Sequence, residues 1–156
     1  FDGEKIVKNI RSGGFILGDE GSAACLGKSF LSDYLKEMVP QEMAEAFGSA
    51  FEVDYPTVVG KVYKGETPSK YLGEFAPWVL SWYDRSDYAR ELVENNFRLF
   101  FKRALSHYDI ASFPVGIIGG FGFACKDIIL NVAASYGIRI STILESPMAG
   151  LIEYHK

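Results

Sequence analysis

Residues 13–22 read Gly13-Gly14-Phe15-Ile16-Leu17-Gly18-Asp19-Glu20-Gly21-Ser22, and this stretch says more about the fold than any other part of the chain. Its two adjacent carboxylates lie between glycines, and glycine allows a positive φ or a close approach to a ligand. A carboxylate held in such a turn can accept hydrogen bonds from ligand hydroxyl groups. Alternatively, Asp19 or Glu20 can cap a helix that begins near Gly21. From the spacing alone, the role of helix cap is favoured over that of ligand contact.

The sequence after this turn has mostly helical patterns of apolar residues. Pro40 ends the first predicted helix, and Pro77 is expected to kink or divide a later one. Asp87 is the expected N-cap of the clearest helix, in which Glu94 and Arg98 are placed for a supporting i,i+4 ion pair. The predicted helices cover residues 22–38, 41–50, 57–63, 69–83 and 88–106.

Strands are predicted on both sides of this helical region. Residues 1–17 read as two or three short strands, the first two joined by a turn at Asp2-Gly3. Residues 114–118 and 138–144 are apolar runs of the buried-strand type, and a helix is predicted between them over 126–136. This order implies a parallel pair of strands with a right-handed crossover. The predicted fold is therefore α/β, with a mixed sheet, flanking helices and a helical insertion.

A second glycine-rich segment, Gly119-Gly120-Phe121-Gly122, follows the first of these C-terminal strands. Such a segment can pass close beneath a nucleotide, because the helix after it favours negative charge at its start. It is not a P-loop, since no Gly-Lys-Ser/Thr follows, and Cys125 occupies the third glycine position of a dinucleotide fingerprint. A plain tight turn is equally compatible with the sequence.

The composition excludes several functional classes. The chain of 156 residues has the size of one domain, and 48% apolar residues are enough for a buried core. The net charge is −4 and both signs are scattered along the chain, which argues against nucleic acid as the main partner. No apolar run reaches the roughly 18 residues that a membrane helix needs, so no membrane association is expected.

The residue types that hold metals or carry out nucleophilic chemistry occur without the spacing that such sites need. Cys25 and Cys125 match no metal-binding pattern and are expected to be buried thiols in a reducing compartment, the cytoplasm. His107 and His155 have no Cys, Asp or Glu at ligand spacing, so no metal site is predicted. No catalytic residue is predicted in this chain.

The stretch Phe15–Ser22, followed by Leu26-Gly27-Lys28, resembles a segment of N-acetylglucosamine kinases and their BadF/BadG/BcrA/BcrD-type ATPase relatives. These proteins belong to the sugar kinase, heat-shock-70 and actin superfamily. The resemblance continues through Val62-Tyr63, residues 115–127 and the ending Ser146–His155, so it spans nearly the whole chain in order.

The resemblance implies two ribonuclease-H-like (actin-like ATPase) lobes with ATP and Mg²⁺ bound between them. Residues 1–156 are then a single domain, the C-terminal lobe, without the N-terminal lobe. Asp19, with Gly14 and Glu20 beside it, is implied to bind the amino-sugar substrate. The catalytic aspartate and most contacts to ATP and Mg²⁺ are implied for the N-terminal lobe, so this chain alone is expected to be inactive. The residues implied for the nucleotide site are Gly119, Gly120, Phe121 and Gly122.

Three questions stay open at this point. Gly13 stands where the family usually has a tryptophan that lines the sugar pocket, which leaves a related amino sugar as substrate. The first alternative function is an ATPase activator of a 2-hydroxyacyl-CoA dehydratase, which holds an iron–sulfur cluster by cysteines. The second is a non-catalytic sensor of a sugar or nucleotide. A homodimer is also left open.

Overall fold

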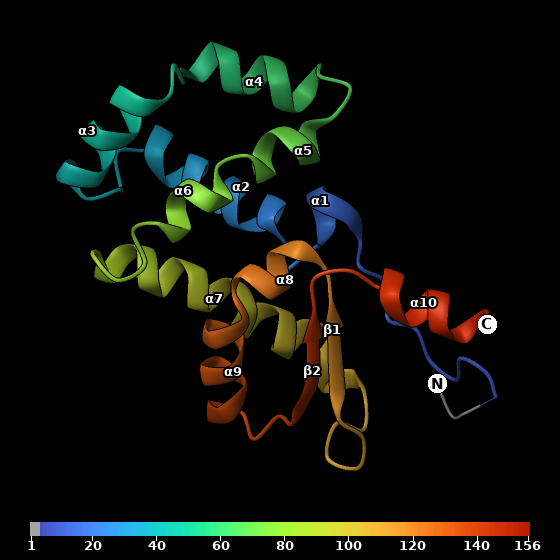
Figure 1. Ribbon diagram of the computed structural model, residues 1–156. Helices are drawn as coiled ribbons and strands as arrows, with labels where there is room; N and C mark the ends of the chain where they lie inside the picture. Colours follow the sequence, from blue (N-terminus) through green and yellow to red (C-terminus); the bar gives the residue numbers. More distant parts are fainter. Residues whose placement is uncertain (1–3) are drawn as a thin grey trace.

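The computed structural model describes residues 4–156, and the turn expected at Asp2-Gly3 lies outside this range. The described chain has an α/β fold with many helices and a small parallel sheet (Figure 1). Its helices are α1 Gly14–Leu17, α2 Ala23–Leu35, α3 Gln41–Ala50, α4 Tyr55–Tyr63, α5 Pro68–Gly73, α6 Ala76–Leu80, α7 Asp87–Arg103, the 3₁₀ helix η1 Leu105–His107, α8 Gly120–Ala124, α9 Lys126–Ser135 and α10 Met148–Tyr154; its strands are β1 Val115–Ile118 and β2 Ile140–Leu144.

Helix α7 lies between the two parts of the molecule (Figure 1). It packs on α2 and α6 of the helical part and on α9 beside the sheet. The helical part has an aromatic core, in which the ring of Phe47 lies 4.8 Å from that of Phe30 and 5.0 Å from that of Trp78. Burial of such large apolar side chains is the main stabilising contribution to a fold of this kind. The helical insertion predicted from the sequence is therefore packed around these rings, and its core is continuous with the one beside the sheet.

The sheet consists of β1 and β2, which pair in parallel. Val115 is opposite Ile140 and Gly116 is opposite Thr142, so the register shifts between these two pairs. Helix α9 connects the strands and packs against α7. The predicted parallel pair is confirmed, but residues 4–156 contain this two-stranded parallel sheet in place of the mixed sheet that the sequence indicated.

The N-terminal strands expected before Gly18 are absent from the described residues. Residues 4–13 have no regular secondary structure, and residues 14–17 form the short helix α1. Gly13 and Gly14 have φ of 80° and 69°, which lie outside the strand region. A strand also needs a neighbour to pair with, and here the contacts are isolated ones: the Ile10 N–H donates to the Tyr108 hydroxyl at 2.7 Å.

Two helix caps differ from the prediction. The Ser22 hydroxyl caps α2 by accepting from the Cys25 N–H at 3.1 Å, so neither Asp19 nor Glu20 is the cap. The Ser86 hydroxyl caps α7, and Asp87 lies one residue inside the helix. In both cases a serine takes the cap, because one short side chain with extended backbone is enough to satisfy an orphan N–H.

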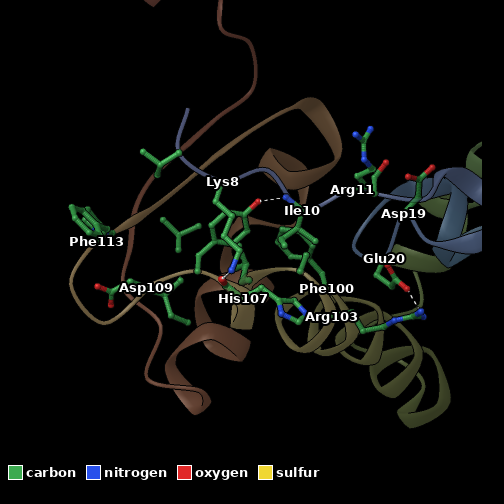
Figure 2. Close-up of a pocket in the computed structure, with 18 residues that line it drawn as sticks. Lys8, Ile10, Arg11, Asp19, Glu20, Phe100, Arg103, His107, Asp109 and Phe113 are labelled. Carbon is green, nitrogen blue, oxygen red and sulfur yellow. Dashed lines mark hydrogen bonds and ion pairs between the residues drawn. The ribbon is translucent and has the colours of Figure 1, made fainter. Parts of the chain in front are cut away.

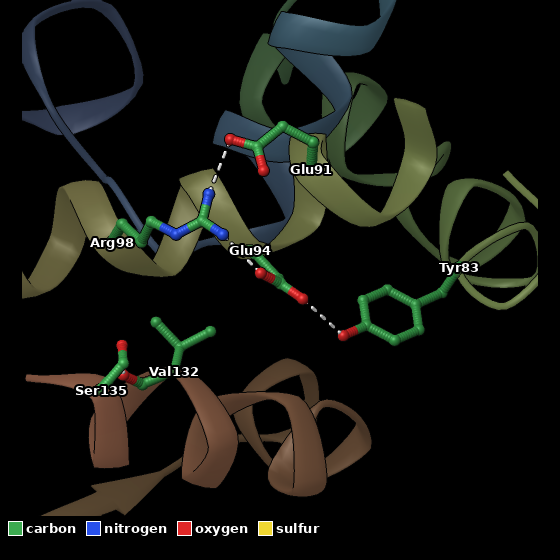
Figure 3. Close-up of polar contacts among 6 residues, drawn as sticks. All are labelled: Tyr83, Glu91, Glu94, Arg98, Val132 and Ser135. Atoms are coloured by element: carbon green, nitrogen blue, oxygen red, sulfur yellow. Dashed lines mark hydrogen bonds and ion pairs between the residues drawn. The ribbon is translucent and has the colours of Figure 1, made fainter. Parts of the chain in front are cut away.

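The ion pair predicted on α7 is confirmed and belongs to a larger network (Figure 3). The guanidinium of Arg98 contacts the carboxylates of Glu91 and Glu94, and Glu94 also accepts from the Tyr83 hydroxyl at 2.9 Å. These contacts raise the pKa of Arg98, with the hydrogen bond to Glu91 as the largest cause. The network ties α7 to the segment that follows α6.

Among residues 4–156, none of the helices combines the length and the apolar character needed to cross a bilayer.

Candidate functional site

The backbone conformation of the turn at residues 18–22 requires particular residue types at several positions. Asp19 has φ 61°, a left-handed conformation that Asp tolerates better than most residues. The Asp19 N–H donates to the Ser12 carbonyl at 3.1 Å, and a Cβ on Gly18 would lie 1.7 Å from that same oxygen. Gly21 has φ 82°. The turn is thus closed against the residues just before α1, and glycine is needed at both positions.

One stripe of α7 supports this turn. Asn96, which is 5% exposed, accepts from the Gly21 N–H at 3.0 Å and donates to the Ser22 carbonyl at 3.1 Å. A Cβ on Gly21 would lie 3.0 Å from Phe100, one helical turn along. Arg103, another turn on, forms an ion pair with Glu20 at 2.5 Å. Sequence reasoning missed these residues; the one signal was a polar Asn96 in the apolar stripe of an amphipathic helix.

Asp19 and Glu20 lie at one end of a cavity of about 890 Å³ (Figure 2). Figure 2 shows Glu20 turned toward Arg103, whereas Asp19 points away from this ion pair. The carboxylate of Asp19 has no ion-pair partner among residues 4–156. Most of the remaining cavity wall is apolar and continues to Phe113 at the opposite end. This end of the cavity therefore presents the unpaired carboxylate of Asp19 beside a mostly apolar wall.

Glu20 also borders a second cavity of about 350 Å³, which segment 119–122 lines as well. The structure thus brings the acidic turn and the glycine-rich segment to one place, although they are about a hundred residues apart. Gly14, by contrast, starts α1 and lines neither cavity. Of the residues expected around the sugar, the structure groups Asp19 with Glu20 and leaves Gly14 outside the cavity walls.

The glycine-rich segment is mostly helical and not the turn that the sequence predicted. Gly119, with φ 141°, precedes α8, and the next three residues lie within that helix. An added Cβ on Gly119 or Gly120 would meet no atom within 4 Å, whereas one on Gly122 would lie 2.9 Å from Ile117. Phe121 stacks on Phe97 of α7, with ring centroids 6.0 Å apart. Open space therefore lies over Gly119 and Gly120, while Phe121 and Gly122 fit the fold itself.

The two cysteines are buried and free, as the sequence predicted. Burial raises the pKa of the Cys25 thiol, and it raises the pKa of Cys125 to about 11. The two thiols are thus disfavoured as thiolates, the form that an iron–sulfur cluster needs. Within residues 4–156 no three His, Cys, Asp or Glu side chains are grouped so that they could hold a metal ion.

No protein-family model and no curated protein matches the sequence. The structure is similar to the crystal structure of a "putative N-acetylglucosamine kinase" from Porphyromonas gingivalis, with a TM-score of 0.94 and 34% sequence identity. The match covers 99% of this chain and 54% of the other, so this chain spans about half the length of that protein. Over nearly its whole length, the chain is thus similar in fold and in sequence to part of the Porphyromonas protein.

Proposed function

We propose that this chain is part of an ATP-dependent carbohydrate kinase that phosphorylates N-acetylglucosamine or a related amino sugar. The observation that carries the proposal is the unpaired carboxylate of Asp19, in a turn that borders a cavity, within a fold similar to the Porphyromonas protein. The finer fold assignment, a ribonuclease-H-like lobe of the BadF/BadG ATPase type, belongs to the same proposal.

Asp19 is the proposed acceptor of sugar hydroxyl groups, and Glu20 and Gly14 lie at the edge of the sugar site. A carboxylate binds hydroxyl donors through charge-assisted hydrogen bonds, which are shorter and stronger than neutral ones. Glu20 already has a partner in Arg103, so Asp19 is the acid of this pair whose lone pairs remain for a ligand. This difference supports Asp19 as the main sugar contact in this chain.

Gly119 and Gly120 are the proposed nucleotide contacts, with Phe121 and Gly122 beneath them. The open space over the first two glycines is the feature that fits a nucleotide, because no atom elsewhere in residues 4–156 lies within 4 Å of a Cβ built on either glycine. Close approach of a ligand to the backbone is a common reason for glycine at such a position. ATP would supply the phosphoryl group here, and Mg²⁺ would be held mainly by residues outside this chain.

A second lobe is the proposed partner of this chain, and it would carry the general base and most phosphate contacts. Phosphoryl transfer depends mainly on positioning the substrates and on neutralising the charge of the phosphoryl group. A chain that holds one half of such a site should therefore bind substrates without catalysing the reaction. The similar protein is nearly twice as long as this chain. Apolar side chains of α10 are exposed, among them Leu151 and Ile152, and they offer a surface for the second lobe.

The experiment that tests this function measures ADP formation by the complete gene product with a panel of amino sugars. We expect ADP formation only when a sugar is present, and no turnover by the 156-residue chain alone. Asp19→Asn keeps a residue that tolerates the left-handed backbone, so it should raise the sugar KM roughly tenfold or more without affecting the KM for ATP. Asp84→Asn, at an exposed position, is the matched control. Absence of sugar-dependent ADP from the complete protein with every sugar would contradict the proposal.

A further inference from the structure

Asn96, Phe100 and Arg103 form a single stripe on α7, because their spacing of four and three residues returns to the same helix face. This stripe contacts three consecutive residues, Glu20 and Gly21 of the acidic turn and Ser22 after them. The Phe100 side chain packs against Gly21, and Asn96 forms hydrogen bonds with the Gly21 N–H and the Ser22 carbonyl. Arg103 forms an ion pair with the Glu20 side chain. The helix therefore determines the shape of the turn from a distance of about 75 residues in sequence.

The amide of Asn96 is suited to this contact because it carries a carbonyl oxygen that accepts and an NH2 group that donates. Its oxygen takes the Gly21 N–H and its nitrogen reaches the Ser22 carbonyl, so neither backbone group is left unpaired. Without Asn96 the Gly21 N–H would lose its partner at a poorly hydrated position, and the Ser22 carbonyl would keep only the N–H of Leu26. The left-handed turn at Asp19 would then lose its anchor. An aliphatic residue would fill the space without restoring either hydrogen bond.

The ion pair of Arg103 with Glu20 separates the roles of the two adjacent acids. The Glu20 side chain is 12% exposed, so its carboxylate is largely shielded and needs a counter-charge. With Glu20 drawn toward α7, the carboxylate of Asp19 is the one that points away from the pair (Figure 2). Loss of Arg103 would leave two neighbouring negative charges free to repel each other and would displace Asp19.

We propose that Asn96 and Arg103 are positioning residues, which act through the turn to hold the Asp19 carboxylate in the orientation that receives a sugar hydroxyl. This inference rests on the proposed function, in which Asp19 binds the sugar. It concerns affinity for the sugar and not affinity for ATP, because neither Asn96 nor Arg103 lines the cavity that segment 119–122 borders.

The test compares the sugar KM and the ATP KM of the complete gene product with those of Asn96→Ala and Arg103→Gln. We expect each substitution to raise the sugar KM roughly tenfold and to leave the ATP KM unchanged. Arg103→Lys, which keeps the positive charge, should have a sugar KM close to that of wild type. Asn95→Ala and Arg90→Gln are matched controls, at an exposed position and in an exposed ion pair of the same helix, and should behave as wild type.

Two further measurements separate positioning from a general loss of structure. In a Glu20→Gln background, Arg103→Gln should change the sugar KM by less than about twofold, because the partner is already gone. In the 156-residue chain, Asn96→Ala should speed hydrogen exchange at the Gly21 amide, read by NMR. If Asn96→Ala does not fold, Arg103→Gln still tests the inference, because the Arg103 side chain is 59% exposed and its replacement should not prevent folding.

Wild-type turnover with an unchanged sugar KM in both variants would contradict the inference and leave the proposed function intact. An equal rise in the KM for sugar and for ATP would also contradict it, because it would indicate a structural defect. A wild-type protein without sugar-dependent turnover would contradict the proposed function, and this inference with it.

Discussion

The backbone of Gly27 in α2 lies directly against the carbonyl of Leu72 in α5: a Cβ added at Gly27 would be 1.8 Å from the Leu72 oxygen. This distance is far shorter than any van der Waals contact, so the two helices meet backbone to backbone at this point. The neighbouring Lys28 donates to the Phe15 carbonyl at 2.7 Å and so ties α2 to α1. The segment Leu26-Gly27-Lys28 therefore joins three helices, which gives a physical reason for its residue types.

Gly27→Ala should destabilise the fold by about 3 kcal/mol or more, because a backbone oxygen cannot move aside as a flexible side chain could. Urea unfolding followed by circular dichroism measures the change. Gly60→Ala is the control: this glycine lies inside α4 with nothing within 4 Å of an added Cβ. Alanine there should stabilise by about 0.5–1 kcal/mol through helix propensity. Equal effects of the two substitutions would show that α2 and α5 do not make this contact.

Stability should fall as the pH rises above about 10, the ordinary pKa of tyrosine, and Tyr88 should account for part of the fall. Burial and the hydrogen bond that its hydroxyl donates to Asp33 raise the pKa of Tyr88 well above that value. The unfolded chain then releases a proton that the folded chain keeps, so the free energy of unfolding decreases with pH by up to about 1.4 kcal/mol per unit.

Tyr88→Phe tests this pH dependence. The variant loses the hydrogen bond to Asp33, so it should be less stable than wild type by about 1 kcal/mol at pH 8. The difference between the two proteins should shrink as the pH rises from 9 to 11, because only wild type loses the contribution of Tyr88. Urea midpoints over this pH range give the result, and a constant difference would rule out the raised pKa.

Arg98→Met should lower stability by about 1 kcal/mol, because it removes the centre of the network with Glu91 and Glu94 (Figure 3). The Arg98 side chain is 30% exposed, so added salt should reduce the difference from wild type only in part. Arg90→Met, which removes a more exposed pair with Asp87, should change stability by no more than about 0.3 kcal/mol. An effect of Arg98→Met no larger than that of Arg90→Met would mean that the network does not stabilise the fold.

Both thiols should be unreactive toward a thiol-specific reagent such as DTNB in the native protein at pH 8. Cys25 and Cys125 are buried, and their raised pKa values keep them as neutral thiols, which are poor nucleophiles. Two thiols per chain should react quickly once urea unfolds the protein. Immediate reaction of either cysteine under native conditions would contradict its placement in the core.

Sequence patterns predicted most of the elements but not the way the chain begins. The helix over residues 41–50 was predicted with the bounds that α3 has, and the strand over 114–118 contains β1. These elements follow from local periodicity. The predicted strands before Gly18 were wrong for the described residues, because a strand depends on a partner that an alternating pattern cannot supply. The left-handed Gly13 and Gly14 turn the chain into α1 instead.

The candidate site was predicted in part. Its acidic turn and glycine-rich segment are local motifs, and both were visible in the sequence. Its support from α7 was not, because the hydrogen bonds of Asn96 reach residues 74 and 75 positions away. Local patterns cannot indicate which helix will lie beneath a turn; only tertiary packing decides this. A single polar residue in an apolar helical stripe was the one sign that such a contact exists.

The most direct test of the account is a crystal structure of the complete gene product with N-acetylglucosamine and a non-hydrolysable ATP analogue. We expect a sugar hydroxyl within hydrogen-bonding distance of the Asp19 carboxylate, Glu20 still paired with Arg103, and the nucleotide against Gly119 and Gly120. A sugar bound out of reach of Asp19, or a nucleotide away from these glycines, would contradict it.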